Sequence, residues 1–339
     1  MDNKTINKEI RKISNFSSLP IAIFFALMGI VQIVYPLFMS WLNKTGISIP
    51  KDIQHIIIYT LQYVGVAFSA ILIFYRTRKK TTGLTLKNCF KKPEMSAGWI
   101  AKWIIIAVAF SYISNFATII VSSIMSLLFG TEYKPLDFNF GNTDVAHFAL
   151  VLALSIYAPF FEELLFRGAV YRNNEILGQK FAMIVTGLAF GLWHTNFTQV
   201  IYASVIGCFA CFLYAKTRSI IPSIILHFII NSITVVMTIF YIPLLGNLTS
   251  INLQKEMALM MENPTSMLII TLLLFSIFVL IITGIVLFII ELVKHRKETT
   301  LRKSIFEIST FKKIAVYFTA PITLITFGYM IIMTVVSIF

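Results

Sequence analysis

The sequence predicts an all-α membrane protein: a polytopic helical bundle of about nine transmembrane helices with a cytoplasmic N-terminus. Of its 339 residues, 58% are hydrophobic and only 13% are charged, whereas a soluble domain has about 25% charged residues. The apolar residues gather in runs of about 20, the length that a helix needs to cross a bilayer. Lys and Arg concentrate in alternate gaps between these runs, as expected of cytoplasmic loops.

The first apolar run covers about 19–42 and follows a polar, basic N-terminal segment. It is longer than the apolar part of a signal peptide and lacks a small-residue cleavage pattern, so we expect a retained span. The third run is long enough to tilt and the fifth and sixth are short, so eight to ten spans fit the sequence. The eight further predicted spans cover about 53–75, 99–129, 144–172, 180–196, 198–215, 219–241, 266–292 and 313–338.

The positions of the basic residues fix the expected orientation. With the N-terminus inside, the inner segments hold 23 Lys and Arg and the outer gaps hold four; Lys102 lies within the third span. Topology therefore explains the net charge of +13, and no nucleic-acid partner is expected. The basic segments 76–98 and 293–313 are expected to lie against anionic lipid headgroups. We expect a multi-pass protein of the bacterial plasma membrane.

Polar residues divide the chain into three parts. Charged residues inside spans are costly and are functional candidates, and here they concentrate between 162 and 231. We therefore expect a catalytic core at 144–241, flanked by accessory helices at 1–143 and 242–339. In the outer loop 242–265, apolar residues recur at helical spacing, which predicts an interfacial helix.

The first polar motif is the segment FFEELLFRG at 160–168. Glu163 and Arg167 are four residues apart on a predicted helix, so they can form an ion pair. Glu162 is rotated by about 100° from its neighbour, and therefore points elsewhere without that partner. One arginine cannot neutralise both carboxylates, so Glu162 is the stronger functional candidate.

Two further motifs follow on later helices. Phe190 and His194 lie at the end of one run, and His227 and Asn231 share one face of another. At about 1.5 Å of rise per residue, the depths of Glu162 and of both histidines overlap. These groups can therefore meet in one pocket within the membrane, nearer the cytoplasmic side. The spacing G-x-x-x-G at 187–191 predicts close helix packing beside this pocket.

This set of groups suits peptide hydrolysis. A buried carboxylate can act as a general base near neutral pH and take a proton from water. A histidine beside it can orient the water, and an amide and a second imidazole can donate to the developing oxyanion. Zinc remains a possible cofactor held by Glu162, His194 and His227, because three protein ligands and a water are usual in catalytic sites, although no H-E-x-x-H helix is present.

The motifs resemble those of the CPBP family, which comprises CAAX proteases and bacteriocin-processing enzymes and is also called the Abi family. The resemblance covers about 144–241 and is specific because three motifs occur in order on three apolar helices. The family includes the eukaryotic Ras-converting CAAX endopeptidase. The matching motifs are E-E-x-x-x-R at Glu162, Glu163 and Arg167, F-x-x-x-H at Phe190 and His194, and H-x-x-x-N at His227 and Asn231.

The resemblance implies an intramembrane endopeptidase with a cavity open to the cytosol and no cofactor, acting on a membrane-associated peptide or protein. It implies Glu162 as general base, His194 as its water-activating partner, and His227 and Asn231 as oxyanion stabilisers. Three alternatives stay open: a zinc-dependent protease using the same residues, a non-catalytic bacteriocin immunity or scaffold protein, and a transporter with a proton relay. The supporting positions are Glu163, Arg167 and Phe190.

Overall fold

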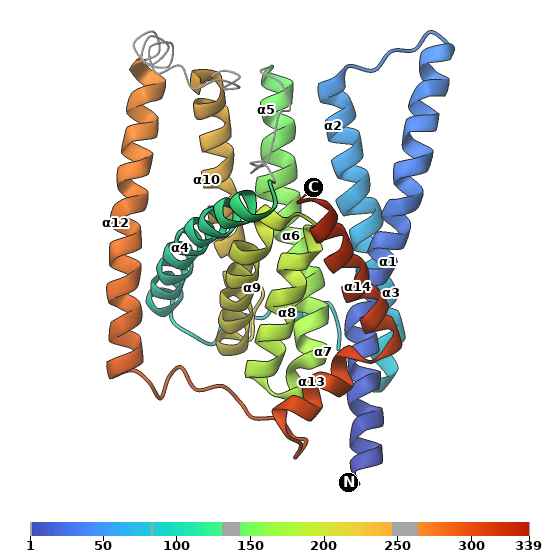
Figure 1. Ribbon diagram of the computed structural model, residues 1–339, viewed down its shortest axis with the longest axis vertical. Coiled ribbons are helices and arrows are strands. Elements are labelled where there is room, and N and C mark those ends of the chain that lie inside the picture. Colours follow the sequence, from blue (N-terminus) through green and yellow to red (C-terminus); the bar gives the residue numbers. More distant parts are fainter. Residues whose placement is uncertain (1, 83, 131–142, 246–263, 339) are drawn as a thin grey trace.

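The structure is a computed structural model that describes residues 2–82, 84–130, 143–245 and 264–338 (Figure 1). Every regular element in these ranges is helical, which confirms the predicted all-α fold. Most of the predicted interfacial helix at 242–265 lies outside the described residues. The elements are α1 (Asn3–Lys44), α2 (Lys51–Thr60), η1 (Leu61–Ala67), α3 (Phe68–Thr82), η2 (Lys87–Cys89), α4 (Ala97–Phe129), α5 (Asp144–Leu150), η3 (Val151–Tyr157), α6 (Ala158–Glu163), η4 (Leu164–Tyr171), α7 (Arg172–Asn174), η5 (Glu175–Leu177), α8 (Gln179–Trp193), α9 (Phe197–Thr217), α10 (Ile221–Leu245), α12 (Pro264–Lys294), α13 (Thr310–Phe318) and α14 (Pro321–Val336).

The chain is a multi-pass membrane protein. Within the described residues, seven helices are long and apolar enough to cross a bilayer, or eight if the bent pair α13–α14 counts as one span. The structure differs from nine full spans at two places. Helix α8 has only 15 residues, or about 22 Å of rise. The last apolar run is bent by 82° between α13 and α14.

Helices α8 and α9 form a hairpin whose turn lies at mid-height in the bundle (Figure 1). The turn uses Thr195 at φ 47°, and Asn196 caps α9 by accepting from the backbone of Thr198. A Cβ added at Gly191 would lie 2.1 Å from the Ser204 hydroxyl of α9. The predicted close packing is therefore confirmed. Two full spans at 180–196 and 198–215 would place the gap between them at the outer surface, but the structure places this turn at mid-height (Figure 1).

Helix α1 begins sixteen residues before the predicted first span, at Asn3. Ile6, Ile10 and Ile13 are buried along one face of this extension. Behind them, Ser14 donates to the backbone carbonyl of Tyr317 at 2.7 Å. The isoleucines recur at helical spacing, so the basic N-terminal segment is an amphipathic extension of α1. It packs on α13.

The basic segments meet at one end of the bundle, the lower end in Figure 1. The backbone N–H of Glu94 donates to Thr217 at 2.9 Å, and that of Gln179 donates to Arg302 at 2.9 Å. The first bond joins the basic segment 76–98 to the C-terminal end of α9, and the second joins the basic segment 293–313 to the start of α8. The predicted inner segments thus share one face of the structure.

Candidate active site

The two adjacent glutamates lie on a short α-helix between two widened stretches of the same span. Helix α6 carries Glu162 and Glu163 and is preceded by η3 and followed by η4, both π-helical. Such stretches add a residue to a helical turn and occur often at functional sites. They change the rotation of side chains along the span, so α6 presents its two carboxylates to different surroundings.

Glu163 lies behind the cavity in a fully buried ion pair. Its Oε1 accepts from Arg167 Nη1 at 2.8 Å, and neither side chain is exposed. Arg167 also donates from Nη2 to the carbonyl of Gly207 at 3.1 Å, and its guanidinium lies 4.5 Å from the ring centre of Phe190. The predicted i,i+4 ion pair is confirmed, and it links η4 to α8 and α9.

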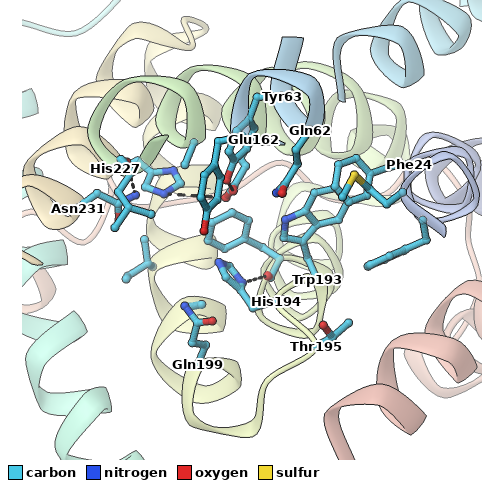
Figure 2. A pocket seen from close by; sticks show the side chains of 18 of the residues that line it. Phe24, Gln62, Tyr63, Glu162, Trp193, His194, Thr195, Gln199, His227 and Asn231 are labelled. Carbon is cyan, nitrogen blue, oxygen red and sulfur yellow. Dashed lines mark hydrogen bonds and ion pairs between the residues drawn. The ribbon is translucent and has the colours of Figure 1, made fainter. Parts of the chain in front are cut away.

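Glu162 faces a cavity of about 460 Å³ that is shown in Figure 2. Only 5% of the residue is exposed. Its Oε1 accepts a hydrogen bond from the Tyr63 hydroxyl at 2.9 Å. Its Oε2 is buried without a hydrogen-bond partner in the described structure. Glu163 Oε2 also lacks a partner, but Glu163 does not line the cavity. Glu162 Oε2 is therefore the free carboxylate oxygen at the cavity wall, on the separate side of the helix that the rotation predicted.

His227 lies between the two glutamates. Its Nδ1 is 3.1 Å from Glu163 Oε1, and its Nε2 is 4.0 Å from Glu162 Oε2. The ionised carboxylate of Glu163 can only accept, so the proton of the neutral ring is assigned to Nδ1. The lone pair on Nε2 then points towards Glu162.

Asn231 lies one helical turn beyond His227 and lines the same cavity. Its Nδ2 donates to the carbonyl of Leu154 at 2.7 Å. An amide nitrogen has two hydrogens, so one N–H remains for a ligand. The bond to Leu154 also fixes α10 against η3, the stretch that leads into α6.

His194 caps the C-terminal end of α8 and lines the cavity opposite His227 (Figure 2). Its Nδ1 bonds the Phe190 carbonyl at 2.9 Å, which again leaves Nε2 as the acceptor. It makes no direct hydrogen bond to Glu162 among the described contacts. The Phe190 ring lies edge-on to both imidazoles, with ring centres 5.2 Å from His194 and 5.6 Å from His227.

The structure thus brings four predicted site residues to one cavity. Glu162, His194, His227 and Asn231 all line it, and so does Phe190. Two residues that the motifs did not predict also line it, Tyr63 and Gln62 of η1. Two polar groups within the apolar run 53–75 were a signal in the sequence, but helical spacing alone cannot connect them to a glutamate 99 positions away.

The described side chains do not form a ready-made set of metal ligands. Across the described ranges, no three His, Cys, Asp or Glu side chains are grouped so that they could hold a metal ion. Glu162, His194 and His227 share the cavity but do not form such a group. We therefore derive no chemical step through a metal.

Comparisons with known proteins agree with the motifs. Residues 144–233 match the family model described as type II CAAX prenyl endopeptidase Rce1-like. The chain is 28% identical over 173 residues to "Putative membrane peptidase YdiL" of Bacillus subtilis (strain 168), an alignment that covers 49% of this chain and 66% of that protein. No solved structure matches. The matched region 144–233 contains all seven motif residues and is similar to this family of CAAX endopeptidases.

Proposed function

We propose that the protein is an intramembrane endopeptidase that hydrolyses a peptide bond of a membrane-associated peptide or protein. One observation carries the proposal: Glu162 Oε2 is buried at a cavity wall without a hydrogen-bond partner, 4.0 Å from the acceptor nitrogen of His227. A water bound between these two atoms could donate a hydrogen bond to each of them, and Glu162 would be the base that takes its proton. Positioned proton transfer of this kind contributes about 10²- to 10⁴-fold to rates.

The proton has a defined route in this proposal. Glu162 Oε2 takes it from the water as the oxygen attacks the carbonyl carbon. It passes to His227 Nε2, and the imidazolium is stabilised by Glu163, whose Oε1 lies 3.1 Å from Nδ1. His227 then gives the proton to the leaving amine. In the substrate complex the water donates its second hydrogen to His194 Nε2 instead, which leaves His227 Nε2 free to receive the proton from Glu162.

The oxyanion is stabilised by donors on α10. Asn231 has a second N–H that its bond to Leu154 does not use. His227 becomes a donor at Nε2 once it has received the proton, and it then stabilises the tetrahedral intermediate until it gives that proton to the leaving amine. Glu163 and Arg167 are positioning residues, since they hold His227 without lining the cavity.

The lining of the cavity favours cleavage within a chain. It contains glutamine, asparagine, tyrosine and apolar side chains but no Lys or Arg among the described residues. Capture of a terminal carboxylate would need a cation or a nest of backbone N–H groups. A neutral, extended segment of a membrane peptide fits these surroundings better than a charged C-terminus.

The decisive test compares two buried glutamates. We expect Glu162→Gln to lower cleavage by about 10²- to 10⁴-fold while the variant still folds. The matched control is Glu291→Gln, because Glu291 is 1% exposed and lies on α12. Peptides that accumulate in membranes of Glu162→Gln cells would be identified by mass spectrometry, and synthetic copies would be assayed in proteoliposomes.

One result would overturn this proposal and two others would favour its alternatives. Equal cleavage by Glu162→Gln and the wild type would overturn the mechanism. Protection against a bacteriocin that persists in Glu162→Ala cells without any cleavage would favour a non-catalytic immunity protein. Loss of activity on exhaustive chelation, restored by zinc alone, would favour the metal-dependent protease.

The basic end of the bundle suggests a lipid partner. We propose that 76–98 and 293–313 lie against anionic headgroups, each charge near the surface contributing about 1 kcal/mol. Phe311 of α13 is 83% exposed beside Lys312, an arrangement typical of an interfacial helix. Stronger association with phosphatidylglycerol than with phosphatidylcholine in native mass spectrometry would support this partner, and equal association would contradict it.

A further inference from the structure

On the three spans that carry Glu162, His227 and Tyr63, the cavity-lining residues lie to one side of these polar groups. On the span that runs from α5 to η5, the lining residues are Leu154, Ala158 and Glu162, and none follows Glu162. This span enters the lower, basic end of the bundle after Glu162. The cavity therefore extends from the glutamate away from the basic end.

The neighbouring helices repeat this asymmetry. On α10, which runs in the opposite direction, lining begins at His227 and continues through Asn231 to Thr234. On α2 and η1, which descend from the upper end, lining includes Tyr59 and stops at Tyr63. Two descending spans and one ascending span thus place the open space on the same side of the catalytic groups.

A floor of packed aromatic rings closes the other side. Phe166 lies four residues after Glu162 on the same span. Its ring centre is 5.1 Å from that of Phe190 and 5.4 Å from that of Trp193. Trp193 in turn lies 3.9 Å from Phe24 of α1. Phe166 is fully buried and the other rings are nearly so. Phe24, Phe190 and Trp193 line the cavity, and Phe166 lies behind them on the side of the basic end.

The α8–α9 hairpin supports the floor. Its turn lines the cavity through Thr195 and Gln199, and the C-terminal end of α14 holds it, because Ser337 Oγ accepts from the Phe197 backbone N–H at 2.9 Å. The far end of the bundle is marked by the bond from Thr143 Oγ1 to Asp52 Oδ2 at 2.9 Å. The hairpin thus fills the lower half of the bundle up to its turn, and the cavity lies beside and above that turn (Figure 1).

Charge assigns these two halves to the two sides of the membrane. The predicted inner segments hold 23 Lys and Arg and the predicted outer gaps hold four. The described parts of the inner segments lie at the closed end (Figure 1), and basic loops stay in the cytoplasm. We infer that the catalytic cavity opens to the outer half of the membrane, and not to the cytosol as the family resemblance implies. Resting on the proposed function, this makes the substrate a peptide whose cleaved segment reaches the outer leaflet or the outer surface.

The inference is tested by labelling from each side, without any need for cleavage. Thr234→Cys and Gln62→Cys place single thiols in the cavity, Ser48→Cys marks the upper end, and Lys303→Cys marks the basic end. The parent carries Cys208→Ala and keeps Cys89 and Cys211, which are fully buried, so its labelling is the blank. The probe is a membrane-impermeant methanethiosulfonate, applied to right-side-out and inside-out vesicles.

We expect the thiols at 234, 62 and 48 to react at least tenfold faster in right-side-out vesicles, and the thiol at 303 in inside-out vesicles. Reaction of both cavity thiols mainly in inside-out vesicles would overturn the inference, as would an exchange of the two marker positions. Failure of both cavity thiols to react from either side would also overturn it. Outward labelling of a chain that cleaves nothing would sink the proposed function and leave the inference standing.

Discussion

Two regions of the molecule use a buried glutamate in an ion pair, and they use it differently. In the central span Asp144–Leu177, 61% of the apolar window is buried, against 11% in Met267–Lys294 of α12. The central pair, Glu163 with Arg167, is completely enclosed. The peripheral pair, Glu291 with Lys102, has a lysine that is 26% exposed. The central pair holds a histidine in place, whereas the peripheral pair holds a helix.

The difference follows from desolvation. A buried charge that loses its partner stays unsolvated, and breaking such a pair costs about 3–5 kcal/mol. In the peripheral pair the lysine is 26% exposed although Glu291 is buried. Water that reaches the position of the lysine can replace part of the lost interaction, so this pair loses less. The comparison therefore predicts a ranking of effects that declines from the floor of the cavity to the edge of the bundle.

The largest effect is expected for Arg167→Met. It leaves the Glu163 carboxylate buried without its cation and removes the donor to Gly207, so we expect destabilisation of about 3–5 kcal/mol. The loss of stability is measured by thermal unfolding in detergent, as the fraction of monodisperse protein that survives heating. The matched variant Lys102→Met should retain most of its stability, and equal losses in the two variants would remove the distinction between the regions.

The next effect concerns the close packing of the hairpin. In Gly191→Ala the new Cβ would meet the Ser204 hydroxyl at 2.1 Å and the Val200 carbonyl at 2.5 Å, so α8 and α9 must separate. We expect a loss of about 1–3 kcal/mol, read from the same unfolding assay. Gly328→Ala on α14 is the control, because nothing lies within 4 Å of its Cβ. A stable Gly191→Ala protein would show that the floor is not rigid.

Contacts within single helices show what the sequence could predict. Relations within one helix follow from its periodicity, and the pairing of Glu163 with Arg167 and the shared face of His227 and Asn231 needed nothing else. The separate direction of Glu162 followed from the same geometry. The three motif helices could be grouped because polar side chains in membrane spans need one another.

Other features depend on contacts between distant segments. Tyr63 reaches Glu162 only because η1 packs on α6, and no local pattern encodes that contact. The apolar runs at 180–196 and 198–215 are separated by few polar residues, so hydropathy cannot distinguish two full spans from a hairpin that turns at mid-membrane. Whether 1–143 and 242–339 act as separate accessory units remains a prediction.

A smaller effect, on rate and not on stability, is expected for Tyr63→Phe. The change removes the hydroxyl that donates to Glu162 Oε1 at 2.9 Å and leaves that oxygen open to the cavity. We expect cleavage to fall by about tenfold, equivalent to about 1.4 kcal/mol, with unchanged unfolding. Tyr112→Phe on α4 is the control, since Tyr112 lies outside the cavity. An unchanged rate would mean that Tyr63 does not orient the base.

The smallest effect is expected for Lys102→Met itself. The change removes the ion pair to Glu291, but α12 keeps its steric fit to α4, where a Cβ at Gly284 would lie 2.3 Å from the Ala109 Cβ. Because that fit is independent of charge, we expect a loss of about 1 kcal/mol or less and an unchanged cleavage rate in proteoliposomes. Gly284→Leu, which breaks the fit and spares the ion pair, should release α12 more strongly. If Lys102→Met instead lowers cleavage as much as Tyr63→Phe, then α12 shapes the catalytic cavity, and the division into a central and a peripheral region must be redrawn around the helix that this lysine holds.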